Sequence, residues 1–219
     1  MNFERKIFLE FIKNPAQIEN RSMEIIAPHL DGLNLSFAEK KIFSRIIHAA
    51  GDVDYAPLIK IHPNAIDAAK SAILRGENIF TDVEMVRTGI NKRALKKFGG
   101  EVFCKVADDD TKIFAAEKNI TRSMAAMRIF GEKLNNSIVA IGNAPTALFE
   151  VLRLVHEENI LPAAIIGVPV GFVGAADSKA ELAAQNKIPF ITVEGTKGGS
   201  SIAVAAVNAI LYLLDDSRN

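Results

Sequence analysis

The sequence predicts an α/β protein in which helices wrap a parallel sheet. From about residue 78, short apolar runs alternate five times with longer segments of helical pattern, an alternation typical of parallel strands joined by helical crossovers. Most runs show little polar alternation, which indicates strands buried on both faces. The 219 residues, 49% of them hydrophobic, are enough to bury one sizeable core.

The residues before the first apolar run are expected to form a mostly helical N-terminal annex. Helical patterns cover residues 15–75. Breaks are expected at 28–34, at 51–61 and at Gly76. No linker composition separates the annex from the rest. We therefore expect a single domain over 1–219, with the annex over 1–76 and a parallel α/β unit over 77–219.

The α/β unit is expected to contain five strands and five helices. The strands are expected at 78–81, 101–106, 137–141, 163–168 and 189–193. The helices are expected at 82–98, 116–134, 145–158, 176–186 and 200–215. Asp82 and Ser200 are plausible capping residues for the first and the last helix. The charged run 108–110 is interpreted as a solvated turn after the second strand, with a metal site as the alternative.

Charge and cysteine content exclude several functional classes. Twenty-six basic residues balance twenty-six acidic ones, so the basic field of a general nucleic-acid binder is missing. The single cysteine, Cys104, excludes a disulfide framework and a cysteine-cluster metal site, and fits a reducing cytoplasm. No apolar stretch has the roughly 18 to 20 residues of a membrane-spanning helix, and the N-terminal MNFERKIFLEF lacks a signal-peptide layout. We expect a cytoplasmic protein without nucleic-acid or membrane partners.

A histidine and an arginine lie three residues apart in an otherwise apolar run. Arg45 and His48 would share one face of a helix that Gly51 ends, so both would project into a pocket at its C-terminal end. Asp52 and Asp54 follow closely and would influence the orientation and the pKa of the imidazole. This pattern predicts acid or base chemistry at His48.

Small residues follow the third, fourth and fifth expected strands, at the edge where parallel α/β folds bind ligands. The segments are 142–146, 169–177 and 194–201. Glycines such as Gly198 and Gly199 let a backbone approach a ligand closely, and amides at a helix start favour an anion. We expect a phosphate or carboxylate there. Because neither GxGxxG nor GxxxxGK[ST] is matched, nucleotide binding is kept only as an alternative.

Two further positions are candidate ligand contacts. Arg122 lies among small apolar neighbours with Thr121 and Ser123 beside it, so the group could hold a polyanion; a salt-bridged surface arginine is the alternative. Ser22 is either a ligand contact or an ordinary helix hydroxyl. Metal-ligand spacing, HExxH and GxSxG are all missing from the sequence. We therefore expect no metal and no cofactor.

Six motifs in this chain resemble, in order, those of the precorrin-8X methylmutases, including the cobalt-precorrin-8 methylmutases. They are RIIHAAGD (45–52), TDVEMVRTGI (81–90), TRSMAAM (121–127), IGNAPTALF (141–149), GVPVGFVGAADSK (167–179) and EGTKGGSS (194–201). The resemblance implies a flavodoxin-like doubly wound fold with a five-stranded parallel sheet. It also implies a homodimer with its active site near the subunit interface.

The resemblance implies an isomerase of cobalamin biosynthesis. Its reaction moves a methyl group from ring carbon 11 to ring carbon 12 of a corrinoid macrocycle, and gives hydrogenobyrinate or its cobalt form, cobyrinate. The family's histidine matches His48, which we expect to donate a proton to the macrocycle. Ser22, Arg45 and Arg122 match substrate-contacting positions of the family.

Several alternatives stay open at this point. The substrate with cobalt and the substrate without it both fit, because no residue need touch the metal. A non-catalytic corrinoid carrier would use the same pocket. A flavodoxin-like domain that binds a nucleotide such as flavin is the third interpretation.

Overall fold

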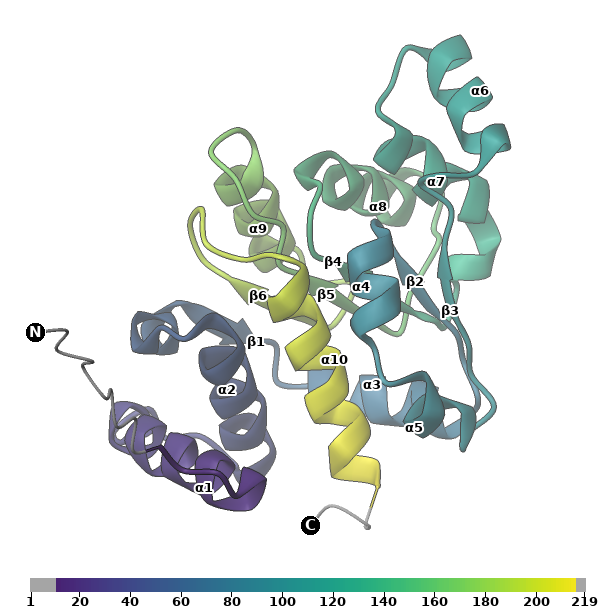
Figure 1. Cartoon of the computed structure of the whole chain (residues 1–219). Coiled ribbons are helices and arrows are strands. Elements are labelled where there is room, and N and C mark those ends of the chain that lie inside the picture. Colours follow the sequence, from purple (N-terminus) through teal and green to yellow (C-terminus); the bar gives the residue numbers. More distant parts are fainter. Residues whose placement is uncertain (1–10, 216–219) are drawn as a thin grey trace, which may run out of the picture.

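A six-stranded mixed sheet with helices on both faces forms the centre of the computed structural model, which describes residues 11–215 (Figure 1). The strands are β1 (Ile59–Ile61), β2 (Ile79–Thr81), β3 (Val102–Cys104), β4 (Ile138–Ile141), β5 (Ala164–Gly167) and β6 (Phe190–Val193). They lie in the order β1-β6-β5-β4-β2-β3. Counted along the chain from β2, the parallel strands have the order 2-1-3-4-5, which is one of the common doubly wound orders.

The structure corrects the expectation of a five-stranded parallel sheet, because the sheet contains a sixth strand. Strand β1 lies inside the segment 51–61 that was expected to be a break, and it pairs antiparallel with β6, with Ile59 opposite Val193. Its residues, Ile-Lys-Ile, are not a continuous apolar run and lie between Pro57 and Pro63, which are turn signals, so the sequence does not reveal this strand. The sheet is therefore mixed, and its β6 edge is covered by a strand from the annex.

The annex contains α1 (Pro15–Ile26), η1 (Ala27–Leu30), α2 (Phe37–Ala50), η2 (Val53–Leu58) and α3 (Ala65–Leu74). Helix α2 begins at Ser36, whose hydroxyl accepts from the Glu39 amide while the Glu39 carboxylate accepts from the Ser36 amide. This capping box fixes the start of the helix. Gly51, with φ of 64°, ends it in the left-handed conformation that glycine adopts without cost.

The remaining helices are α4 (Glu84–Gly89), α5 (Lys92–Lys96), α6 (Asp109–Lys118), α7 (Arg122–Phe130), η3 (Gly131–Leu134), α8 (Pro145–Glu157), α9 (Ala175–Ala184) and α10 (Ser200–Leu214). Two of the expected helices are thus pairs of helices. The first divides before Asn91, whose side chain accepts from the Ala94 amide and starts α5. The second divides after Asn119, which is left-handed at φ of 51° and ends α6.

The expected turn at 108–110 is instead the start of helix α6. Asp108 is its N-cap residue, and Asp109 and Asp110 lie in its first turn, where the helix dipole favours negative charge. The ammonium of Lys105 lies 3.0 Å from a carboxylate oxygen of both Asp108 and Asp110. Among the described residues, no group of three His, Cys, Asp or Glu side chains could hold a metal ion.

One hydrophobic core joins the annex to the sheet. Ile42 and Ile46 of α2 are fully buried and belong to the same cluster as Ile202 of α10 and the sheet residues Ile138 and Ile166. A second cluster fills the opposite face, beneath α7 and α8. Residues 1–10 and 216–219 lie outside the described residues, as do the expected domain bounds 1 and 219 and most of the N-terminal segment assessed for a signal peptide. Within the described part, none of the helices has the length and apolar character needed to cross a membrane.

Candidate active site

His48 is an exposed side chain in the last turn of α2, beside a cavity of about 290 Å³. The cavity lies between α1, the end of α2 and the start of η2. It is lined by Ser22, Ile25, Ile26, Ile47, His48, Gly51, Asp52 and Val53. The structure therefore brings the expected histidine and Ser22 together, and gives them an apolar wall of isoleucines. The Ser22 hydroxyl donates to the Ile18 carbonyl at 2.9 Å, which leaves its oxygen as an acceptor for a second group.

Arg45 lines a different cavity, contrary to the expectation of one shared pocket. Its Nη2 lies 2.7 Å from Oε1 of Glu19, and its guanidinium carbon lies 5.4 Å from the centre of the Tyr212 ring. The cavity beside it, about 340 Å³ in volume, is lined by Met23, Leu30 and Phe37 among others. Although Arg45 and His48 are one turn apart on α2, they meet different residues of α1.

The glycine loop, residues 194–199 between β6 and α10, lies against the end of α2. Lys197 Nζ is 2.5 Å from Oδ2 of Asp52, and this hydrogen bond lowers the pKa of the Asp52 carboxyl. The Tyr55 hydroxyl donates to the Gly198 carbonyl at 3.5 Å. These contacts place Gly198 and Gly199 next to the segment that lines the His48 cavity.

Gly198 allows this loop to touch the loop after β5. A Cβ on Gly198, at φ of 156°, would lie 2.4 Å from the Val168 carbonyl oxygen and 2.7 Å from that of Pro169, which no side chain can do. The Gly199 amide donates to the Val168 carbonyl at 2.9 Å. The Gly199 amide is thus already engaged within the protein and is not an open donor for the anion expected at this edge.

Thr121, Arg122 and Ser123 start helix α7 at the same edge of the sheet. Thr121 accepts from the Met124 amide, and its hydroxyl lies 3.0 Å from that of Thr146 at the start of α8. Since α8 follows β4, this contact brings the start of α7 to the carboxyl ends of the strands. Arg122 is exposed there, and no salt bridge to it is found among the described residues.

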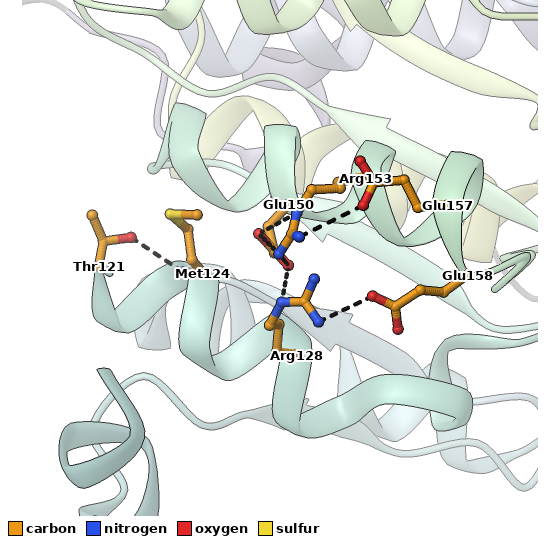
Figure 2. A network of polar contacts seen from close by, with 7 residues as sticks. All are labelled: Thr121, Met124, Arg128, Glu150, Arg153, Glu157 and Glu158. Atoms are coloured by element: carbon orange, nitrogen blue, oxygen red, sulfur yellow. Dashed lines mark hydrogen bonds and ion pairs between the residues drawn. The ribbon is translucent and has the colours of Figure 1, made fainter. Parts of the chain in front are cut away.

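A buried ionic network links α7, the helix that Arg122 begins, to α8 through Arg128 and Glu150 (Figure 2). The Glu150 side chain is fully buried, with Oε1 2.5 Å from Arg128 Nε and 2.8 Å from Arg153 Nη2. Arg128 also pairs with Glu158 at 3.0 Å. Arg153 lies on α8 itself, three residues after Glu150, so Arg128 is the partner that links α7 to α8, and separating the helices would remove one of the two guanidinium groups from a buried carboxylate.

Asp82 changes the interpretation of the segment 142–146. Its buried carboxylate accepts hydrogen bonds of 2.7 to 2.9 Å from the amides of Gly142, Asn143 and Ala144. Burial raises the pKa of Asp82, and the three amide hydrogen bonds oppose that rise. Asp82 does not cap the helix that follows it, and the amides expected to bind an anion are occupied by its own carboxylate.

The structure adds Lys179 to the candidate site, and it pairs Asp52, expected beside His48, with Lys197 of the expected edge segment 194–201. Lys179 lies in α9 and is 1% exposed. The available signal is its place among the small apolar residues that follow the fourth strand. The loop after β5 completes the edge: a Cβ on Gly174 would lie 3.5 Å from Phe149 and 3.6 Å from Pro145 at the start of α8.

Comparisons with known proteins all indicate the same family. Residues 17–213 match the family model described as precorrin-8X methylmutase. The chain is 42% identical to the cobalt-precorrin-8 methylmutase of Priestia megaterium, over 96% of this chain and 93% of that protein. It is 40% identical to the precorrin-8X methylmutase of a Sinorhizobium species, over 92% of this chain and 96% of that protein. The solved precorrin-8X methylmutase of Thermus thermophilus superposes with a TM-score of 0.82 at 32% identity, covering 92% and 99% of the two chains.

Proposed function

Because this chain belongs to the precorrin-8X methylmutase family, we infer that it is an isomerase of cobalamin biosynthesis acting on precorrin-8X or cobalt-precorrin-8. The reaction moves a methyl group from ring carbon 11 to ring carbon 12 of the corrinoid macrocycle. The observation that carries the proposal at this chain's own residues is the exposed His48 beside a cavity that also contains Ser22. The parallel strand order 2-1-3-4-5 supports assigning this part of the sheet to the flavodoxin-like folds.

His48 is proposed as the proton donor. As imidazolium it would protonate the macrocycle and favour the tautomer in which migration of the methyl group restores conjugation. Since the reaction is an isomerisation, the macrocycle must return one proton before the product leaves. The exposed position of His48 beside the cavity at the C-terminal end of α2 supports this role, because a ligand can reach the ring there.

The carboxylates of the macrocycle are proposed to bind along the same edge. Arg122 is the exposed cation at the start of α7, with the hydroxyls of Thr121 and Ser123 beside it, and a guanidinium can hold a carboxylate through two hydrogen bonds. The Ser22 hydroxyl, which donates to the Ile18 carbonyl, would accept a hydrogen bond from a donor group of the substrate near His48. Arg45 is held by Glu19, with side chains 37% and 51% exposed, so a substrate carboxylate would have to replace Glu19.

A homodimer is also proposed, with the loop after β5 facing the second copy. Phe172 and Val173 are 95% and 90% exposed in the single chain, and exposed apolar residues in a cluster are typical of interaction sites. Light scattering should give twice the chain mass for the protein and a smaller mass for Phe172→Ser. The free cysteine, Cys104, supports a proposed location in the reducing cytoplasm.

Conversion of substrate tests the function directly. The protein is incubated with precorrin-8X and, separately, with its cobalt form, and a spectral change without a change of mass is expected for at least one. Binding of hydrogenobyrinic acid without any conversion would instead support a corrinoid carrier. A flavin spectrum in the purified protein would support the nucleotide-binding alternative.

Substitution of His48 tests the proton donor. His48→Ala is expected to lower kcat by about a hundredfold to ten-thousandfold, the usual share of general acid catalysis, while affinity for the product is retained. His156→Ala is the matched control, since His156 is an exposed histidine of α8. Wild-type turnover in His48→Ala would contradict the assignment of His48 and leave the family function intact.

A further inference from the structure

Lys179 is a buried cation without a carboxylate partner among the described residues. It lies in α9, its side chain is 1% exposed, and its ammonium donates to the backbone carbonyl of Lys197. Burial lowers the pKa of Lys179 to about 8. A charge removed from water without an ion pair costs stability, so the fold gains nothing from an ammonium here that an apolar side chain of similar volume would not supply.

The carbonyl that Lys179 binds belongs to the residue that joins the glycine loop to the His48 segment. The Lys197 backbone contacts Lys179 on one side, and its own ammonium reaches Asp52 at 2.5 Å on the other. Asp52 directly follows Gly51, which ends the helix of His48. Lys197 is therefore held by α9 through its backbone carbonyl and by the annex through its ammonium group.

The next residues of the loop have little freedom once Lys197 is fixed. The Gly199 amide donates to the Val168 carbonyl at 2.9 Å, and the Gly171 amide donates to the Thr196 carbonyl at 3.2 Å. Gly198 lies so close to the Val168 carbonyl that a Cβ would be 2.4 Å from it. Two loops that follow neighbouring strands are thus joined by backbone hydrogen bonds. The Lys179 ammonium adds a charged donor to the same loop from α9.

We propose that Lys179 is a positioning residue for the methylmutase reaction, because its ammonium fixes the Lys197 carbonyl and thereby holds the glycine loop against the end of α2 where His48 lies. This inference rests on the proposed function. It predicts that Lys179 affects binding of the corrinoid although its own side chain is shielded from the ligand. It also predicts that the effect of Lys179 passes through the contact between Lys197 and Asp52.

The first test separates positioning from stability. In Lys179→Met the melting temperature is expected to equal or exceed that of the wild type. Its dissociation constant for hydrogenobyrinic acid and its KM are expected to rise about tenfold, the size of one charge-assisted hydrogen bond, with a smaller fall in kcat. Lys179→Gln, which keeps a donor, is expected to recover part of the affinity. Lys187→Met is the matched control, because Lys187 donates to the Val155 carbonyl at 3.5 Å, away from the glycine loop.

The second test measures coupling. If Lys179 acts through Lys197 and Asp52, the double variant Lys179→Met with Asp52→Asn binds hydrogenobyrinic acid less weakly than the product of the two single losses predicts. Wild-type affinity in Lys179→Met, or independent losses in the double variant, would overturn the inference. Should Lys179→Met not fold, Lys179→Gln takes its place in both tests, and wild-type affinity in Lys179→Gln, or independent losses when it is combined with Asp52→Asn, would overturn the inference. A wild-type protein that converts neither substrate would refute the proposed function instead.

Discussion

The ammonium of Lys197 lies 2.5 Å from the carboxylate of Asp52, a residue 145 positions earlier in the chain. Lys197 Nζ also lies 5.2 Å from the centre of the Tyr55 ring. Through these contacts the loop after the last strand meets the segment that follows the helix of His48. The annex and the sheet therefore contribute neighbouring parts of the candidate active site.

Replacing Asp52 should weaken ligand binding without unfolding the protein. Asp52→Asn removes the partner of Lys197, so we expect a several-fold loss of affinity for hydrogenobyrinic acid in equilibrium titrations at pH 7. Because the pair is partly exposed, the free energy of unfolding should hardly change. Asp54→Asn is the control, since the Asp54 side chain is exposed; equal losses in both variants would refute a specific role of Asp52.

The same contact has a defined pH dependence. The hydrogen bond from Lys197 lowers the pKa of Asp52, so the contribution of the pair is present above the ordinary carboxyl pKa of about 3.9. It is lost as the pH falls through the lowered value of the folded state. Affinity losses in Asp52→Asn should therefore be the same at pH 5.5 and pH 6.5, both of which lie well below the pKa of about 8 of Lys179.

Gly198 and Gly195 offer a matched pair in one loop. Both have positive φ, but a Cβ on Gly195 meets nothing within 4 Å, whereas a Cβ on Gly198 would lie 2.4 Å from a carbonyl oxygen. Gly195→Ala is expected to cost about 1 to 2 kcal/mol from backbone strain alone. Gly198→Ala should cost more and abolish corrinoid binding, because the loop must move. Urea unfolding and ligand titration check this, and equal costs for the two variants would be the contrary result.

Substitutions of two arginines in α7 are expected to affect different properties, one the binding of the ligand and the other the stability of the fold. Arg122 is exposed, so Arg122→Ala is expected to weaken hydrogenobyrinic acid binding with the fold intact. Arg128→Ala leaves the buried Glu150 with one guanidinium fewer (Figure 2) and should lower the free energy of unfolding by about 3 kcal/mol. Unchanged affinity in Arg122→Ala would make Arg122 a merely structural surface residue.

Much of the fold can be predicted because its parallel strands lie in short apolar runs that alternate with longer helical patterns. The end of α2 at Gly51 is equally predictable, since glycine adopts the left-handed conformation there. The three-residue strand β1 is not, because its only support is pairing with β6. Likewise, one helical pattern over 116–134 hides the break at Asn119.

The site is harder to predict because its contacts join distant segments. His48 and Ser22, which the sequence gives as separate candidates, line the same cavity. The partner of Arg45, however, is Glu19 of another helix, and the amides after β4 bind Asp82. Lysines in helices are ordinarily exposed, so the burial of Lys179 follows only from how α9 packs under the glycine loop.

Cys104 should be unreactive in the folded protein. Burial raises the pKa of its thiol to about 11, so very little thiolate is present at neutral pH, and the thiolate is the reactive form. Alkylation by iodoacetamide at pH 7.5 should be about a hundredfold slower than that of a free cysteine. Because Cys104 is the single cysteine, mass spectrometry reports it directly. Unfolding in urea should restore the ordinary rate, and fast alkylation without urea would refute the prediction.

Stability at alkaline pH should depend on Lys179. The pKa of Lys179 is about 8 in the folded protein against an ordinary 10.5. Below pH 8 the ammonium is charged in both states, and the cost of burying the charge is fully present. Between about pH 8 and 10.5 the unfolded chain binds a proton that the folded protein lacks, so the stability of the wild type rises relative to Lys179→Met. Urea unfolding of both proteins at pH 7, 9 and 10 measures this difference, in which groups common to both proteins cancel. A difference that stays constant over this range would mean that Lys179 is not a buried ammonium at neutral pH.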